Sequence, residues 1–324
     1  MWRDEEFLSY LTSLEKGFPS LVQLFVANYV CNSNCRYCPI GKINFGDAQR
    51  KTHEKEAFME WSVFEKVARE VGKHPETILR FHGRGEPTMH PRFIDMVSFA
   101  KQMGIRHVAT FTNGILVSHD YAKGLLGAGI DLIEFSVDAF TPETYSLLRR
   151  TSMFDTVKSN VLETIRLRDE MKKDAKIFVS AVDHTEFAKE KEKFQDYWSK
   201  YADEVIFRRR TSFNDRVSYA DWNKIESVNA YPCIQPWTRF NVSPFGKVNF
   251  CANDWGDEFL VGDLNDTEDT IESIWKSEKY QEFRNLHLKL GIPKNYCLNC
   301  TESSEANWKN SYEKIIASFS KNES

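Results

Sequence analysis

Three cysteines near the start of the chain have a spacing that suits metal chemistry. Cys31, Cys35 and Cys38 are separated by three and then two residues, directly after an apolar stretch. A structural zinc site takes four protein ligands, and three thiols cannot pair into disulfides without leaving one over. An iron–sulfur cluster held by three cysteines, with one iron open to another ligand, fits this count best. Zinc, or a cysteine cluster without a metal, is the alternative.

A glycine-rich loop follows a second apolar run, residues 77–82. It reads Gly83-Arg84-Gly85-Glu86-Pro87. Glycine lets the backbone approach a ligand closely, and a carboxylate behind it can accept hydrogen bonds from an ammonium group. An ordinary turn is the alternative, because Gly-x-Gly loops are common.

The elements that must position these residues alternate along the first two thirds of the chain. Trp61, Phe64, Val67 and Val71 recur at helical spacing, and Thr141 precedes Pro142 as a helix cap would. Six strand–helix units indicate a parallel α/β fold, and six are too few for a closed eight-fold barrel. We therefore expect a partial (β/α)6 TIM barrel with its chemistry at the C-terminal strand ends. The expected strands are residues 21–30, 77–82, 106–111, 132–137, 176–182 and 204–207.

The cysteine triplet and the glycine loop together resemble the radical S-adenosylmethionine (SAM) superfamily. The resemblance implies a [4Fe–4S] cluster on the three cysteines, with SAM bound to its open iron. In relatives the reduced cluster cleaves SAM, and the 5′-deoxyadenosyl radical abstracts hydrogen from an unactivated carbon. The residues that match the SAM contacts of that family are Tyr37, Gly85, Glu86, Thr112, Asn113, Ser136, Asp138 and Arg149. Their alternative roles are helix caps, turns or exposed charges.

Four further cysteines stand in the last third of the chain. Cys233 and Cys251 have 17 residues between them, and Cys297 and Cys300 form a close pair. The segment between the first two reads as a hairpin with a Pro-Phe-Gly turn, and a helix is expected from residue 270 to 288. This order resembles the SPASM-type extension in its shorter Twitch form, which implies one auxiliary [4Fe–4S] cluster in a small α+β extension. A zinc ribbon is the alternative.

Three plus four cysteines use all seven thiols, and this count bears on the reaction. An epimerase of this family commonly returns hydrogen from a free thiol, and none is left here. An oxidation must dispose of a second electron, which an auxiliary cluster can accept, as in relatives that oxidise an aminocyclitol. Our leading expectation is therefore the dehydrogenation of a sugar or cyclitol alcohol. Peptide (RiPP) modification, sugar epimerisation and a non-enzymatic iron–sulfur electron carrier are the alternatives. Many peptide-modifying relatives carry a leader-recognition module before the cysteine triplet, whereas only 30 residues precede Cys31 here; a separate leader-binding protein could take its place.

The residues that would handle the substrate are less clearly marked. Arginines 208–210 follow the sixth expected strand, where one or two can point inward and bind a carboxylate or phosphate; a salt-bridged face is the alternative. An alcohol oxidation also needs a group that takes the hydroxyl proton. The candidates for these catalytic roles are Asp183, His184, Arg210, Asp215 and Tyr219.

Composition limits the partners. The 324 residues carry a net charge of −4, and no long apolar segment is present, so we expect neither nucleic-acid nor membrane binding. Seven cysteines suit a reducing compartment, so we expect the cytoplasm. Besides a small-molecule substrate, we expect a one-electron reductant such as flavodoxin or ferredoxin. The expected divisions are an N-terminal extension (1–20), the barrel domain (21–215), the auxiliary-cluster domain (216–310) and a C-terminal tail (311–324).

Overall fold

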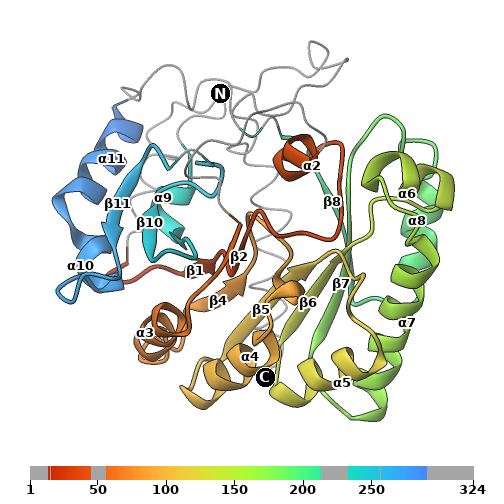
Figure 1. Ribbon diagram of the computed structural model, residues 1–324, viewed down its shortest axis with the longest axis horizontal. Coiled ribbons are helices and arrows are strands. Elements are labelled where there is room, and N and C mark those ends of the chain that lie inside the picture. Colours follow the sequence, from red (N-terminus) through yellow and green to blue (C-terminus); the bar gives the residue numbers. More distant parts are fainter. Residues whose placement is uncertain are drawn as a thin grey trace.

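The computed structural model describes residues 14, 16–44, 56–211, 213, 233–255 and 257–289. Its described strands form one curved nine-stranded sheet in the order β11-β10-β9-β1-β4-β5-β6-β7-β8, beside a two-stranded sheet of β2 and β3 (Figure 1). This arrangement is an α/β fold with a C-terminal extension of the same sheet, which agrees with the expected fold class.

The six expected parallel strands are present and adjacent in chain order. One boundary was wrong: the expected strand over residues 21–30 ends at Leu24, because the chain leaves the sheet there and pairs Ala27–Asn28 (β2) with Ala57–Phe58 (β3). This early exit frees residues 29–38 to form the loop that carries the cysteines. The six strands are β1 (Leu21–Leu24), β4 (Ile78–Phe81), β5 (His107–Thr112), β6 (Leu132–Ser136), β7 (Lys176–Val182) and β8 (Glu204–Arg208).

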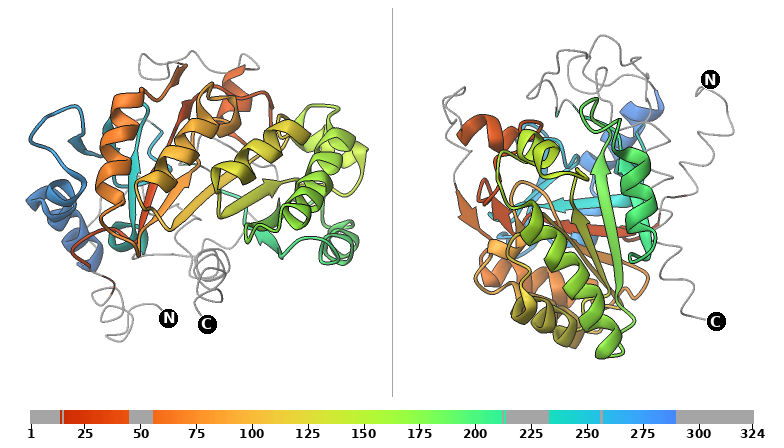
Figure 2. Two further views of the ribbon diagram at one scale, coloured as in Figure 1. Left: turned by 90° about the horizontal axis from the view of Figure 1, so that it is seen from below. Right: turned by 90° about the vertical axis from the view of Figure 1, so that its right-hand side faces the viewer.

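Helices connect these strands and cover the outer face of the sheet (Figures 1 and 2). The apolar spacing predicted for α3 is confirmed, with Phe64, Val67 and Val71 buried. Thr141 caps α6, since its side chain accepts from the Thr144 amide. The helices of this part are α2 (Pro39–Asn44), α3 (Trp61–Val71), the 3-10 turn η1 (Pro87–Met89), α4 (Phe93–Gln102), α5 (His119–Ala128), α6 (Pro142–Arg149), α7 (Phe154–Glu170) and α8 (Lys191–Trp198).

The two faces of the parallel sheet bury different kinds of side chain. Outward residues such as Val22 and Leu79 pack with the helices in the main core. Inward residues such as Leu21 and Ile78 join a smaller apolar cluster at one end of the strands. Further along several of these strands the inward positions turn polar, and Gln23 on β1 stands in register with Arg80 on β4, both of them buried. This change from apolar to polar creates the floor of a binding site at the C-terminal strand ends.

The C-terminal extension continues the same sheet. The expected hairpin is confirmed: β9 (Arg239–Val242) and β10 (Lys247–Asn249) are antiparallel, and β9 pairs in parallel with β1. Gly246 in the connecting turn has a φ of 73°, a conformation that favours glycine. The order of the extension is α9 (Gln235–Thr238), β9, β10, β11 (Leu260–Asp263), α10 (Ile271–Lys276) and α11 (Glu278–Leu288).

The single helix expected over residues 270–288 was wrong. Ser277 has an extended backbone with ψ of 152°, and its side chain accepts from the Tyr280 amide as the cap of α11. Thr270 caps α10 in the same way. The expected domain division at residue 215 stays a prediction, although strands from both sides of it share one sheet. In the described part of the chain, no helix has the length and hydropathy required to cross a bilayer.

Candidate active site

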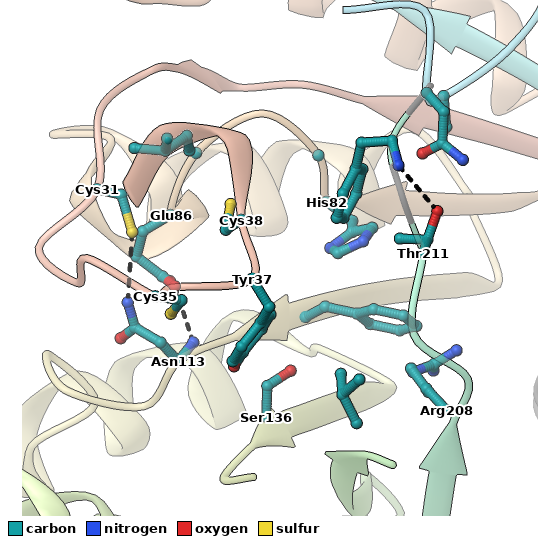
Figure 3. Close-up of a pocket in the computed structure, with 18 of the residues that line it drawn as sticks. Cys31, Cys35, Tyr37, Cys38, His82, Glu86, Asn113, Ser136, Arg208 and Thr211 are labelled. Carbon is teal, nitrogen blue, oxygen red and sulfur yellow. Dashed lines mark hydrogen bonds between the residues drawn. The ribbon is translucent and has the colours of Figure 1, made fainter. Parts of the chain in front are cut away.

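One cavity of about 300 Å³ lies at the C-terminal ends of the parallel strands. Its walls bring together side chains from the cysteine loop, the glycine loop and the ends of β5 and β6 (Figure 3). The structure places around it the first three cysteines, all eight residues that match SAM contacts, and two of the three predicted arginines, namely Cys31, Cys35, Cys38, Tyr37, Gly85, Glu86, Thr112, Asn113, Ser136, Asp138, Arg149, Arg208 and Arg209.

The cysteine loop is fixed by backbone contacts on both sides. The amide of Arg36 donates to the carbonyl of Leu148 at 3.0 Å, which ties the loop to the end of α6. On the other side, Gly41 passes so close that a Cβ there would stand 2.1 Å from the carbonyl oxygen of Cys35. Only glycine tolerates such an approach, so the turn from the loop into α2 depends on it.

The glycine loop packs directly against the cysteine loop. The Glu86 amide donates to the Val30 carbonyl at 2.9 Å, and the Tyr29 amide donates to the Arg84 carbonyl at 2.6 Å. A Cβ on Gly85 would lie 2.7 Å from the carbonyl oxygens of Ala27 and Val30. The close approach that glycine permits here is therefore between two segments of the chain, which places Glu86 beside the cysteines.

The Glu86 carboxylate is buried and accepts hydrogen bonds from its own chain. Thr88 donates through its amide and its hydroxyl, Thr112 through its hydroxyl at 2.7 Å, and Asn113 through its amide at 2.8 Å. Burial raises the pKa of Glu86, and these four donors oppose that rise. Asn113 also directs its side-chain amide toward Cys31 Sγ at 3.8 Å. Thus Glu86, Thr112 and Asn113, predicted separately, form one network next to the first cysteine.

A second network holds the middle of the cysteine loop. The Tyr37 hydroxyl donates to the Asp138 carboxylate, which also pairs with Arg149 and accepts from the Val182 amide at 2.7 Å. Asp138 has a φ of 64°, a sparsely populated conformation that such contacts can hold in place. Arg149 donates to Cys35 Sγ at 3.6 Å. Arg149 therefore places a fixed positive charge beside this sulfur.

Cys31 and Cys38 sit in surroundings that disfavour a free negative charge on their thiols. Burial raises the pKa of the Cys38 thiol to about 12 and also raises that of Cys31. Such thiols stay protonated until a metal binds and displaces the proton. Around them, as elsewhere in the described chain, no three His, Cys, Asp or Glu side chains are grouped for a single metal ion. A cluster differs from a single ion in this respect, because each of its cysteines binds a different iron.

Cys233 and Cys251 directly precede residues that line the extension side of the same cavity. Each sulfur accepts a hydrogen bond from the amide two residues further on, from Gln235 at 3.4 Å and from Asn253 at 3.3 Å. Amide groups that point at sulfur stabilise a thiolate ligand. Both of these neighbours line the cavity. The two remaining predicted ligands, Cys297 and Cys300, lie outside the described residues.

The described acid–base candidates do not line the cavity. Asp183 is exposed and forms an ion pair with Lys191 at 2.8 Å. His184 is buried against the ring of Tyr37, and burial lowers its pKa to about 4. Arg210 is half-buried and contributes a positive charge near His184. The other two candidates, Asp215 and Tyr219, lie outside the described residues, so their roles stay predictions.

Several polar side chains in the cavity wall were missed from the sequence, among them Gln23, Arg80, His82 and Arg239. Gln23, Arg80 and Arg239 come from the strands β1, β4 and β9, and His82 directly follows β4. A signal was present for the first two, because each is the single polar residue of an otherwise apolar four-residue strand. A long polar side chain buried in a strand interior usually has a function or a partner to satisfy it.

Comparison with protein families supplies the identity. Residues 26–181 match the family model described as the radical SAM superfamily, and residues 233–301 match the SPASM model, described as an iron–sulfur cluster-binding domain. The chain belongs to the radical SAM superfamily. Its cofactors are therefore a [4Fe–4S] cluster, SAM and an auxiliary iron–sulfur cluster. That the auxiliary cluster is single, as in the Twitch form, stays a prediction from the cysteine count.

Curated relatives match part of this radical SAM protein. It is 35% identical over 109 residues to the tungsten-containing aldehyde ferredoxin oxidoreductase cofactor-modifying protein of Pyrococcus furiosus, over 33% of this chain and 28% of the relative. It is 26% identical over 156 residues to the probable GTP 3′,8-cyclase of Methanothermobacter thermautotrophicus, over 48% of each chain. The matched regions thus span less than half the length of these relatives.

Solved structures resemble the radical SAM protein over most of its length. BtrN in complex with AdoMet and 2-DOIA has a TM-score of 0.57 at 17% identity, covering 89% of this chain and 94% of BtrN. Streptococcus suis SuiB bound to the precursor peptide SuiA has a TM-score of 0.63 at 13% identity, covering 86% of this chain and 69% of SuiB. At these identities the likeness concerns the fold.

The described residues fit the cofactors of the superfamily. Cys31, Cys35 and Cys38 border one cavity from a single loop, and the Arg149 guanidinium lies beside the sulfur of Cys35. Cys233 and Cys251 would supply two of the ligands that the auxiliary cluster needs. In this radical SAM enzyme one cavity is therefore bordered by the loops of both cysteine sets.

Proposed function

We propose that this enzyme oxidises an alcohol group of a small polar molecule, such as a sugar or cyclitol, to a ketone. In this proposal the auxiliary cluster is the electron acceptor, flavodoxin or ferredoxin is the reductant, and the reaction takes place in the cytoplasm. The likeness in fold to BtrN, which was solved with AdoMet and the small molecule 2-DOIA, supports a small-molecule substrate.

The observation that carries the proposal is the shared cavity. Ile234 and Gln235 follow Cys233, Ala252 and Asn253 follow Cys251, and all four line the same cavity as the first three cysteines. A substrate in this cavity would touch residues adjacent to both cysteine sets. A cavity volume of about 300 Å³ is at the lower end of the range for small-molecule sites.

The chemistry divides between cofactors and chain. When bound, SAM and its cluster supply hydrogen-atom abstraction from the alcohol carbon, and the auxiliary cluster supplies the acceptor for the remaining electron. The chain must then take the hydroxyl proton, so that the alcohol loses one hydrogen atom, one proton and one electron in total. It must also hold the substrate and exclude water, tasks that suit a buried polar cavity.

His82 is the residue that we assign to the hydroxyl proton. It lines the cavity, and its ring packs on Phe111 with centroids 4.7 Å apart. Burial and the charges of Arg80, Arg208 and Arg239 lower the pKa of His82 well below 6.5. The imidazole is therefore neutral at pH 7 and free to accept a proton.

The test is a substrate screen with the reconstituted enzyme under anaerobic conditions. SAM, reductant and a panel of sugars and cyclitols, neutral and phosphorylated, are incubated together, and products are analysed by mass spectrometry. The proposal expects a product that has lost two hydrogen atoms, formed in equal amount to 5′-deoxyadenosine. A product of unchanged mass with one inverted carbon would instead establish an epimerase.

A peptide substrate is the second candidate, because SuiB, which was solved with its precursor peptide, shares the fold. Its readout is modification of peptides encoded near the gene, without turnover of any alcohol in the panel. The variant His82→Asn separates the candidates further. Alcohol oxidation should lose at least about tenfold in rate without the base, whereas SAM cleavage should continue.

A further inference from the structure

The end of the cavity that faces away from the cysteine loop carries an excess of positive charge. Five of the described residues that line the cavity are arginines, and two carry carboxylates. Both carboxylates, Glu86 and Asp138, lie on the cysteine side. In Figure 3, Arg208, Thr211 and His82 lie at the opposite end of the cavity from Cys31 and Glu86.

The two carboxylates already interact with groups on the cysteine side of the cavity. Asp138 pairs with Arg149, and Glu86 accepts from four donors of the neighbouring loops. At the far end, Arg208 forms a bidentate pair with Glu134, with contacts of 2.6 to 2.9 Å. The other arginines also have polar partners in the chain. The argument therefore rests on the number and placement of the charges.

The arginines converge on one region. The guanidinium carbons of Arg80 and Arg208 each lie 5.0 Å from the centre of the Phe111 ring, so the two are at most 10 Å apart. His82 packs on the same ring. Arg80 and Arg208, together with Arg239, are close enough to His82 to act on its imidazole.

A buried side-chain amide at this end of the cavity also indicates a ligand with an acceptor group. The side chain of Gln23 is fully buried and lines the cavity. Its oxygen accepts from Arg80, which fixes the orientation of the amide. Among the residues that the structure describes, no acceptor lies within hydrogen-bond distance of the Gln23 Nε2 group. A buried donor without an acceptor costs free energy until a ligand supplies one.

We propose that the substrate carries an anionic group, a phosphate or a carboxylate, that binds Arg80, Arg208 and Arg239 and accepts from Gln23. This inference rests on the proposed function, because it takes the bound anion to be part of the oxidised molecule. Guanidinium groups bind both anions through charge-assisted, often bidentate hydrogen bonds. An anion at this end leaves the alcohol carbon toward the cysteine loop.

The same anion would assist the proton transfer. It offsets the positive charges around His82, which makes the imidazole a better proton acceptor when substrate is bound than when the cavity is empty. A neutral substrate analogue would leave those charges in place. Binding and base strength are therefore expected to depend on the same group of the substrate.

Isothermal titration of the reconstituted enzyme with inorganic phosphate, and in parallel with acetate, tests the inference. Arg239→Gln should weaken binding of the preferred anion at least about tenfold. Arg209 is exposed and also lines the cavity, next to Arg208 in the chain. Arg209→Gln removes one of the positive charges around the cavity, so it should weaken anion binding by a smaller factor without disturbing the fold. Arg166→Gln, on the exposed face of α7, is the matched control and should leave the affinity unchanged. Tighter binding of phosphate than of acetate would assign a phosphorylated substrate, and the reverse a carboxylate.

Two outcomes would overturn the inference. One is an enzyme that binds neither anion, and the other is equal affinity in the wild type, Arg239→Gln and Arg209→Gln. The substrate screen separates this failure from that of the proposed function. Oxidation of a neutral alcohol with unchanged kcat/KM in Arg239→Gln would refute the anion site and support the proposed oxidation. Arginine-dependent anion binding without oxidation of any alcohol would support the anion site and refute the proposed oxidation.

Discussion

Arg84 connects the two cysteine loops, and its removal tests whether they are held as one unit. It lies inside the glycine loop with only 2% of its side chain exposed, and it pairs with Asp257 at 2.8 Å. It also donates to the carbonyl of Asp254, whose own amide donates to the backbone carbonyl of Cys251 at 3.1 Å. The change Arg84→Met keeps the length and apolar stem of the side chain but removes both contacts.

The structure sets the size of the effect. Breaking a buried ion pair by removing one partner costs about 3–5 kcal/mol, because the other charge stays buried. Asp257 keeps 17% of its side chain exposed and still accepts from Asn249 at 3.0 Å. We therefore expect a loss at the lower end, about 3 kcal/mol in the free energy of unfolding. The matched control is Arg69→Met, whose exposed pair with Glu65 is worth at most about 0.5 kcal/mol.

The assay is anaerobic urea unfolding of the reconstituted enzyme, followed by tryptophan fluorescence, for Arg84→Met, Asp257→Asn and the double variant. The two changes should share a coupling energy of at least about 1 kcal/mol, since the residues touch. The electron paramagnetic resonance signal of the auxiliary cluster should change with Arg84→Met and not with Arg69→Met. A loss below about 1 kcal/mol with additive single variants would refute the reasoning.

Three further predictions follow from individual contacts. Cys35→Ala should abolish SAM cleavage, whereas Cys251→Ala should keep part of the cleavage and stop product formation. Both are measured as 5′-deoxyadenosine and product in the same assay. Full product formation by Cys251→Ala would show that the auxiliary cluster is structural. Gly85→Ala would place a Cβ 2.7 Å from two carbonyl oxygens and should cost about 1–3 kcal/mol of stability. Urea unfolding measures this loss against the control Gly127→Ala, where nothing lies within 4 Å of the added Cβ. Equal stabilities of the two variants would contradict the close packing. Burial lowers the pKa of His287 from 6.5 to about 4, so the unfolded chain takes up this proton first as the pH falls, and about 1.4 kcal/mol of stability should be lost between about pH 7.5 and 5.5. His287→Gln should remove that part of the pH dependence, and an unchanged pH profile would show that the folded protein protonates His287 normally.

Much of the architecture could be predicted because its signals are local. Apolar runs predicted six parallel strands, and all six are present. The errors arose where tertiary contacts decide: the first strand ends at Leu24 because β2 pairs with β3, and Ser277 breaks the last expected helix by capping α11. No local pattern marks the end of the first strand. Ser277 is of a residue type that often caps helices, and this signal was missed inside a segment that otherwise has a helical pattern.

By itself the sequence predicted the residues that hold the cofactors, from three cysteines in one loop and a glycine–glutamate loop after the next parallel strand. It also placed arginines 208–210 at the end of a strand, where an inward side chain can bind an anion. Which residues join Arg208 at the end of the cavity that we propose for the substrate was decided only by the tertiary structure. Gln23, Arg80, Arg208 and Arg239 come from strands up to 216 positions apart in the chain, and only the order of the strands in the sheet brings them together. The role that we propose for them depends on charges that are close in space, and the spacing of these residues along the chain does not show that proximity.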